Sequence, residues 1–227
     1  RILRDESTAS GIATIAVEDT GENTIVIVPG ANDRVNESDC DRLTDLLPQA
    51  AALLLQLEIP LPAVLAAAKK AKNAGVLVIL DPAPARELPP ELYSLIDIIT
   101  PNETELSILT GIAVTDRDTA TEAITELQKR GVRTAIAKLG GKGVLCARGE
   151  EQLFVPPFEV EAVDTVAAGD AFNGALAVAI AQGLPLAEAV LYGAAAGALT
   201  VTKPGAQSAL PSRLTFEEFL RKQKIKQ

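Results

Sequence analysis

Residues 164–170 combine small side chains with a carboxylate in a way that suits phosphate chemistry. Ala167, Ala168 and Gly169 would let a phosphate approach the backbone closely, and the N–H groups that open a helix near Asp170 carry a partial positive charge. Asp170 then stands where a general base would be needed. An Asp at a helix start also serves as a plain cap. The segment therefore predicts either an anion cradle with a base or an ordinary helix N-terminus.

A second pair of polar residues, Asn102 and Glu105, follows a predicted strand at residues 96–100. The i, i+3 spacing places both on one helix face, at the sheet edge where ligands collect in α/β proteins. There they could hold hydrated Mg²⁺ together with a nucleotide. The same spacing makes a capping box that needs no ligand. Spacing alone leaves both interpretations open.

Three further segments at predicted element ends could contact a ligand. The glycine-rich one joins two strands, so it is not a Walker loop, which opens a helix, but its backbone could lie against a nucleotide. Its residues are Lys138, Leu139, Gly140, Gly141, Lys142 and Gly143. Glu58 follows another strand at the ligand edge, and the carbonyl groups of residues 203–207 would suit a monovalent cation or the edge of an adenine ring. A plain turn, an exposed carboxylate and a surface loop are the simpler explanations.

Composition directs the chemistry toward phosphoryl transfer. The 227 residues include no histidine, which excludes Ser-His-Asp and Cys-His catalysis and histidine metal sites. Phosphoryl transfer needs mainly positioning and charge stabilisation, which carboxylates, lysines and backbone dipoles supply. The net charge of -9 argues against a nucleic-acid partner, and the apolar runs are too short to span a membrane. Cys40 and Cys146 form no paired motif, which favours a reducing cytoplasm.

Hydrophobic patterning predicts an α/β protein. Residues 11–17 and 24–29 form a predicted β-hairpin around a polar turn, outside the main sheet. From residue 39 onward strands alternate with helices, as in parallel crossover units. The predicted helices span residues 40–47, 62–73, 118–130, 171–181 and 186–202, with others beginning near 102 and 216, and the predicted strands span residues 52–57, 76–80, 96–100, 134–139, 143–147 and 152–155. We therefore expect a single domain with a mostly parallel sheet covered by helices on both faces.

Together these motifs resemble the ribokinase branch of the PfkB family of carbohydrate kinases, and the similarity runs through nearly all of the chain. Residues 164–174 match the family's second signature, residues 101–105 its Asn-x-x-Glu segment and residues 138–143 its nucleotide loop. The resemblance implies that Asp170 is the catalytic base and that Glu105 positions Mg²⁺. It further implies an anion hole at Ala167, Ala168, Gly169 and Asp170, nucleotide contacts that include Asn102 and Ala194, and a sugar contact at Glu58.

The reaction that the resemblance implies is transfer of the γ-phosphoryl group of ATP to the primary hydroxyl of D-ribose, which gives ribose 5-phosphate. Mg²⁺ and K⁺ would assist, the latter at Asp164, Val166, Thr200, Lys203 and Gly205. The fold would be of ribokinase type, and the hairpin at residues 11–29 would belong to a sugar lid through which two copies form a homodimer. The alternatives are a PfkB kinase that acts on fructose or a nucleoside, and a catalytically silent relative that binds or regulates.

Two departures from the family pattern affect these expectations. The family's first strand, its early sugar-binding Asp and its Gly-Gly-Lys loop have no counterpart before Arg1, so we expect residues 1–227 to lack the N-terminal portion of the fold. Residues 1–227 by themselves should then bind nucleotide weakly and phosphorylate sugar poorly. Val166 replaces the usual Thr of the signature, which keeps a backbone carbonyl for K⁺ but removes a hydroxyl.

Overall fold

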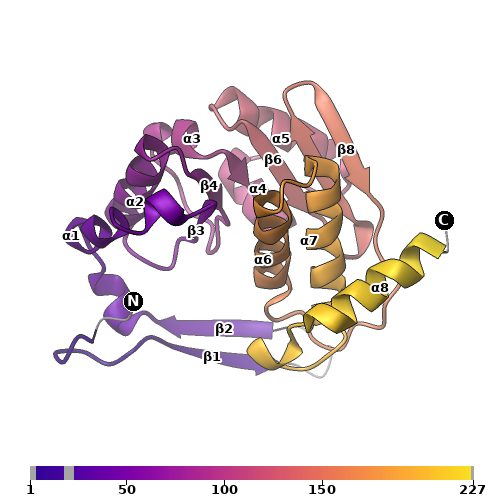
Figure 1. Ribbon diagram of the computed structural model, residues 1–227, viewed down its shortest axis with the longest axis horizontal. Coiled ribbons are helices and arrows are strands. Elements are labelled where there is room, and N and C mark those ends of the chain that lie inside the picture. Colours follow the sequence, from indigo (N-terminus) through magenta and orange to yellow (C-terminus); the bar gives the residue numbers. More distant parts are fainter. Residues whose placement is uncertain (1–3, 18–22, 226–227) are drawn as a thin grey trace.

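A six-stranded sheet forms the centre of the molecule in a computed structural model that describes residues 4–17 and 23–225 (Figure 1). The strands are β3 (Ala52–Leu55), β4 (Leu77–Leu80), β5 (Ile98–Ile99), β6 (Thr134–Lys138), β7 (Val144–Arg148) and β8 (Glu151–Val155), and they lie side by side in that order. β3 to β6 run parallel, whereas β7 and β8 are antiparallel. The predicted α/β class with a mostly parallel sheet is confirmed.

Helices cover both faces of this sheet. They are α1 (Glu37–Cys40), α2 (Leu61–Asn73), α3 (Pro90–Leu95), α4 (Glu103–Thr110), α5 (Arg117–Lys129), α6 (Ala168–Ala181), α7 (Leu186–Thr200) and α8 (Arg213–Ile225). Successive strand residues point to opposite faces, so Val78 and Leu80 join the core under α2 to α5 while Ile79 joins the core under α6 and α7. Within the described residues, no helix is both long enough and apolar enough to cross a membrane.

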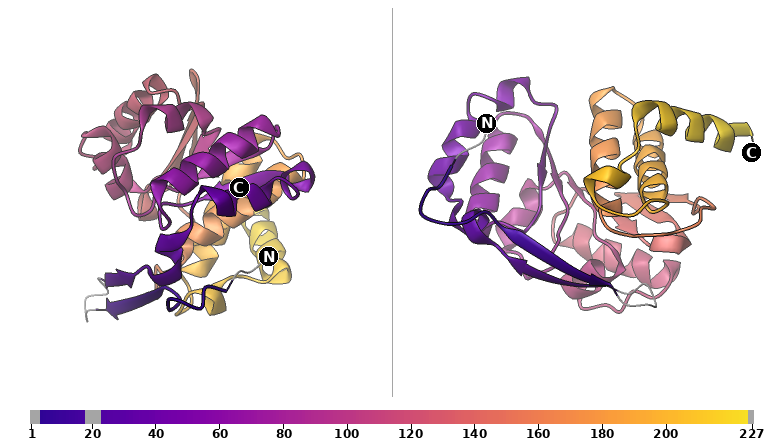
Figure 2. Two further views of the ribbon diagram at one scale, coloured as in Figure 1. Left: turned by 90° about the vertical axis from the view of Figure 1, so that its left-hand side faces the viewer. Right: turned by 90° about the horizontal axis from the view of Figure 1, so that it is seen from below.

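The predicted hairpin is confirmed as a separate two-stranded ribbon, β1 (Ile12–Val17) paired with β2 (Asn23–Val28). Most of the turn predicted between its strands lies outside the described residues. Figure 2 shows the ribbon projecting from the body of the molecule. Several of its apolar side chains are exposed, namely Ile12, Ile15, Val26, Ile27 and Val28. The ribbon therefore lacks a partner surface within the described part of the chain.

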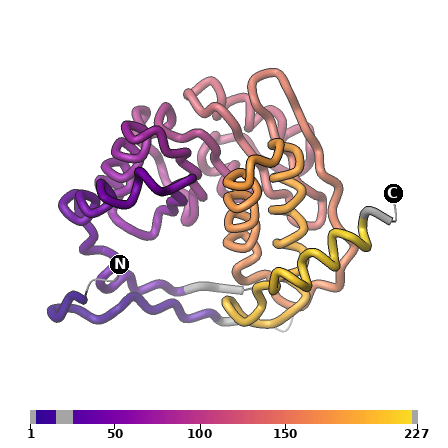
Figure 3. The backbone as a smooth tube through the Cα atoms, in the orientation of Figure 1, coloured from indigo at the N-terminus to yellow at the C-terminus, as the bar shows by residue number. Residues whose placement is uncertain are grey.

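Three local predictions need correction, and Figure 3 traces the backbone through them. The helix predicted at residues 40–47 is wrong: α1 ends at Cys40 and is followed by 3₁₀ turns at Asp41–Leu43 and Leu47–Gln49. Beyond Cys40 backbone N–H groups bond to carbonyls three residues back, as from Thr44 to Asp41, and Pro48 has no N–H to continue an α-helix. The strand predicted at residues 96–100 pairs as β5 only at Ile98–Ile99. α3 was not expected, and it begins where Pro90 occupies the first helical position.

Candidate active site

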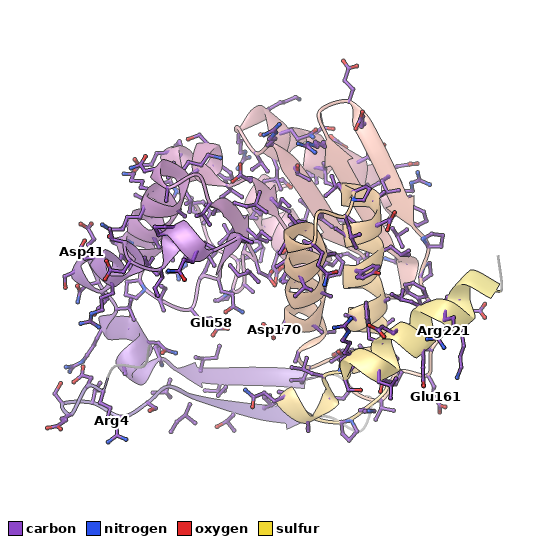
Figure 4. The ribbon with its side chains drawn as sticks, viewed as in Figure 1. Arg4, Asp41, Glu58, Glu161, Asp170 and Arg221 are labelled. Carbon is purple, nitrogen blue, oxygen red and sulfur yellow. The ribbon has the colours of Figure 1, made fainter. Side chains whose placement is uncertain are left out.

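The carboxyl ends of β3, β4, β5 and β6 meet the N-terminus of α6, which carries Asp170. The side-chain amide of Gln56, just after β3, donates a hydrogen bond to Asp170 Oδ1 at 3.3 Å. Glu58 is exposed. In Figure 4, Glu58 lies below β3 and Asp170 lies at the neighbouring end of α6. The structure thus brings the predicted base and the predicted sugar contact to one edge of the sheet.

The predicted anion cradle is built at the start of α6. Ala167 precedes the helix with φ 61°, a left-handed conformation that is unusual for a residue with a side chain. The first-turn N–H groups of Gly169 and Asp170 have no acceptor among the hydrogen bonds of the described residues. Free N–H groups at a helix N-terminus attract an anion. Among the described residues no side chain forms a cap hydrogen bond with this helix, so Asp170 lies in its first turn without acting as a hydrogen-bonding cap.

Asp170 lies in surroundings that favour its protonated form. Burial raises the pKa of the Asp170 carboxyl, Asp81 raises it further, and Lys138 partly offsets both effects. Asp170 remains exposed, so its desolvation is partial, and a partly desolvated carboxylate is a stronger base than one in water. The arrangement can therefore accept a proton from a hydroxyl group placed beside the cradle.

Asn102 and Glu105 form the capping box that their spacing predicts. Asn102 Oδ1 accepts the Glu105 N–H at 2.8 Å, and the backbone and side-chain N–H groups of Asn102 donate to Glu105 Oε2 and Oε1 at 2.7 and 2.9 Å. Burial raises the pKa of Glu105, while the backbone N–H of Asn102 acts in the opposite direction. Each carboxylate oxygen keeps a lone pair, so the pair could still hold hydrated Mg²⁺.

The glycine-rich segment connects β6 to β7 through a 3₁₀ turn at Gly140–Lys142. Gly143 has φ 101°, and a Cβ there would lie 2.4 Å from the Val155 oxygen, so only glycine fits. Leu139 is buried, whereas Lys142 Nζ donates to Glu103 Oε1 at 2.7 Å and to the Thr115 carbonyl at 2.8 Å. The backbone of Gly140 and Gly141 remains open for a ligand, since no atom lies within 4 Å of a Cβ built there.

The segments predicted to bind K⁺ lie together. Asp164 accepts backbone N–H groups from Val166 at 3.0 Å and from Gly205 at 2.8 Å, and these bonds lower the pKa of Asp164. Thr200 is buried and donates its hydroxyl to the Ala196 carbonyl. Among the described residues, no backbone N–H donates to the carbonyl oxygens of Val166 and Lys203. Free carbonyl oxygens are the donors that a monovalent cation prefers, so these segments fit the ion.

Four polar residues beneath the cradle were not recognised from the sequence as one cluster. Lys138 Nζ lies 3.0 Å from both oxygens of Asp81, Asn173 Nδ2 donates to Asp81 Oδ2 at 2.5 Å, and Thr100 donates to Asn173 Oδ1 at 2.8 Å. Asp81 and Thr100 directly follow buried strands, which is the one signal that could have indicated them. The predicted nucleotide contact Ala194 lies in α7, partly buried against the core beside α6.

A carboxylate, an open helix N-terminus and a glycine-rich loop at one edge of a parallel sheet are typical of enzymes that transfer a phosphoryl group. Comparison with known families agrees, since residues 1–213 match the family described as pfkB family carbohydrate kinase. The chain belongs to the pfkB family of carbohydrate kinases, whose members transfer phosphate to a sugar.

The relatives within that family include ribokinases. The chain is 45% identical over 211 residues to the ribokinase of Haemophilus influenzae, covering 93% of this chain and 69% of that protein. The crystal structure of ribokinase from Thermotoga maritima is similar with a TM-score of 0.85 at 41% identity, covering 94% of this chain and 70% of that one. The structure of Arabidopsis thaliana ribokinase complexed with ribose and ATP is similar with a TM-score of 0.85 at 37% identity, covering 93% and 69%. The predicted ribokinase-type fold is confirmed.

Proposed function

We propose that this protein transfers the γ-phosphoryl group of ATP to the primary hydroxyl of D-ribose, with Asp170 as the general base. The observation that carries the proposal is the Asp170 carboxylate, exposed at the sheet edge and held by Gln56, directly beside the unoccupied N–H groups of the α6 N-terminus. Relatives named as ribokinases, one of them solved with ribose and ATP, support the choice of substrates.

In the proposed reaction the carboxylate of Asp170 accepts the proton of the primary hydroxyl as its oxygen attacks the γ-phosphorus. The new oxygen–phosphorus bond forms while the bond to the β-phosphate oxygen breaks, and ADP leaves with that electron pair. Backbone N–H groups of residues 167–170 stabilise the negative charge on the transferring group. Gln56 holds one oxygen of Asp170, so the other oxygen is available for the proton.

We propose that Glu105 and Asn102 position hydrated Mg²⁺, which neutralises phosphate charge when the nucleotide is bound. Among the described residues, no group of three or more Cys, Asp or Glu side chains could hold a metal by itself, so the nucleotide would supply the remaining ligands. Asp164, Val166, Thr200, Lys203 and Gly205 would hold K⁺ beside the cradle. The remaining proposed contacts are Glu58 for the sugar, and Ala194 and residues 138–143 for the nucleotide.

The hairpin of β1 and β2 is the proposed sugar lid, appended to a single α/β domain, and we propose that two copies of the protein dimerise through it. A two-stranded ribbon is only marginally stable in water, and exposed apolar side chains on it favour a partner surface. Ile12→Glu combined with Val26→Glu should convert a dimer into a monomer in light-scattering measurements. Ile108→Glu, on the exposed side of α4, is the matched control and should leave the mass unchanged.

The experiment that tests the proposed reaction is a coupled ADP-release assay on the full-length protein with D-ribose, fructose and adenosine as acceptors. We expect ATP-dependent turnover with D-ribose to give the highest kcat/KM, and the product to be ribose 5-phosphate by mass spectrometry and NMR. Preference for fructose or adenosine would contradict the proposed substrate. Nucleotide binding without turnover on any sugar would instead indicate a catalytically silent relative.

A further inference from the structure

The Asp81–Lys138 pair lies directly beneath the anion cradle. A Cβ built on Gly169 would lie 3.2 Å from Lys138 Nζ and 3.6 Å from Asp81 Oδ2, so both charges touch the first turn of α6. Their side chains are largely buried, with 15% of Lys138 and 8% of Asp81 exposed. A buried ion pair of this kind adds little stability by itself, because desolvation offsets the attraction between the charges.

A hydrogen-bonded network fixes this pair to α6. Asn173 lies one turn after Asp170 on the same face of the helix, and it donates to Asp81 while it accepts from Thr100. The network therefore joins the ends of β4, β5 and β6 to the turn that carries the base. Asp81 and Lys138 are held at a fixed place relative to Asp170.

We propose that Asp81 and Lys138 act as a charge-balanced pair that positions the α6 N-terminus and sets the proton affinity of Asp170. Within the described part of the chain, the charged groups that act on Asp170 from the neighbouring strands are Asp81, after β4, and Lys138, at the end of β6. The contact from β3, Gln56, is neutral, and Glu58 is exposed toward the same space. The same two residues act on Glu105, on α4, where Asp81 also raises and Lys138 also lowers the pKa of the carboxyl group.

The charge-balanced pair leads to a specific prediction. Removing Asp81 and removing Lys138 should shift the titration midpoint of Asp170 in opposite directions. Asp81→Asn leaves Lys138 uncompensated, so it should lower the titration midpoint of Asp170 by about 1 pH unit and lower KM for ATP. Lys138→Met leaves Asp81 uncompensated, so it should raise the midpoint by about 1 pH unit and raise KM for ATP. The double variant restores neutrality and should return the midpoint close to that of the wild type. A purely structural role would destabilise both single variants without opposite shifts.

The test is ¹³C NMR titration of side-chain carboxyl groups in full-length protein, with Asp170→Asn used to assign the Asp170 resonance. Asp97→Asn is the matched control, since Asp97 pairs with Lys72 at 2.5 Å outside the Asp81 network and should leave Asp170 unchanged. Shifts of the two single variants in the same direction, or no shift in either, would overturn the proposal. If a single variant does not fold, the double variant decides, because a midpoint far from wild type would contradict charge balance.

This inference rests on the proposed function for its meaning, but its measurement does not. The carboxyl titration needs no turnover, so opposite shifts in a protein that phosphorylates no sugar would support the pair while contradicting the proposed reaction. If the protein phosphorylates ribose but neither substitution shifts the titration of Asp170, the proposed reaction is supported and the role of the pair is contradicted.

Discussion

The side-chain amide of Gln56 and the carboxylate of Asp170 meet at 3.3 Å, across 114 positions of the chain. The contact joins the end of β3 to the first turn of α6, so the proposed base is held by a neutral donor from one side. The Asp81 network holds the same turn from the other side. A carboxylate that is oriented but not neutralised by an ion pair of its own is suited to accept a proton.

Asp170 should reduce the stability of the fold at neutral pH. Burial, and after it Asp81, raises the pKa of Asp170 above its ordinary value, so ionisation destabilises the folded state as pH rises through that raised pKa. Asp170→Asn should therefore melt at a higher temperature than the wild type at neutral pH, and the difference should shrink below the ordinary pKa. A lower melting temperature at neutral pH would contradict this assignment.

Asp164 is a control for this prediction, because its pKa is shifted in the opposite direction to that of Asp170. Backbone N–H groups of Val166 and Gly205 lower its pKa, so its contribution to stability is present above the ordinary pKa and is lost as pH falls through the lowered one. Asp164→Asn should melt below the wild type at neutral pH, with the difference disappearing in acid. Thermal scans of both variants across the same buffers test the two signs together.

Glu105→Gln should separate metal positioning from capping. The substitution keeps an acceptor for the Asn102 N–H but removes the charge that attracts hydrated Mg²⁺. We expect the Mg²⁺ concentration for half-maximal activity to rise severalfold with little change in melting temperature. Asp116→Asn alters a similar capping box at the start of α5 and should leave the Mg²⁺ requirement unchanged. Clear destabilisation of Glu105→Gln with an unchanged Mg²⁺ requirement would favour a structural role.

K⁺ should activate the enzyme more than Na⁺ at matched ionic strength. The Val166 and Lys203 carbonyl oxygens are free of backbone donors in the described residues, and Asp164 holds their loops together. A cation bound there would order the residues that lead into the anion cradle. Initial rates in KCl and NaCl measure the effect, and equal rates would argue against the site.

Close packing of α7 against α6 predicts a stability effect at Gly193. A Cβ at this position would lie 2.9–3.0 Å from ring atoms of the buried Phe172. Gly193→Ala should therefore destabilise the protein by roughly 1–3 kcal/mol. Gly174→Ala is the control, because no atom lies within 4 Å of its Cβ and alanine favours helix by about 1 kcal/mol. Chemical denaturation of both variants gives the comparison, and equal stabilities would show that the contact relaxes.

Much of the fold was predictable because hydrophobic periodicity and strand-end motifs are local signals. The helix at Leu61–Asn73, the β7–β8 hairpin and the capping box of Asn102 and Glu105 follow from neighbouring residues alone. The helix predicted at residues 40–47 was wrong because an apolar pattern does not distinguish an α-helix from the successive 3₁₀ turns that form there.

The polar cluster beneath the cradle could not be predicted in the same way. Asp81 lies 57 positions from Lys138 and 92 from Asn173, and only the sheet order brings them together. Asp170 was predicted because its small neighbours precede it directly, whereas the residues that act on it come from other strands.

The measurement that tests the central claim most directly is kcat of Asp170→Asn in the full-length protein with ATP and D-ribose. Asparagine keeps the size of the side chain and the space for nucleotide but cannot accept the hydroxyl proton. We expect kcat to fall by roughly 10²–10⁴-fold while ATP affinity is retained. A variant that keeps more than about half of the wild-type turnover would contradict Asp170 as the general base.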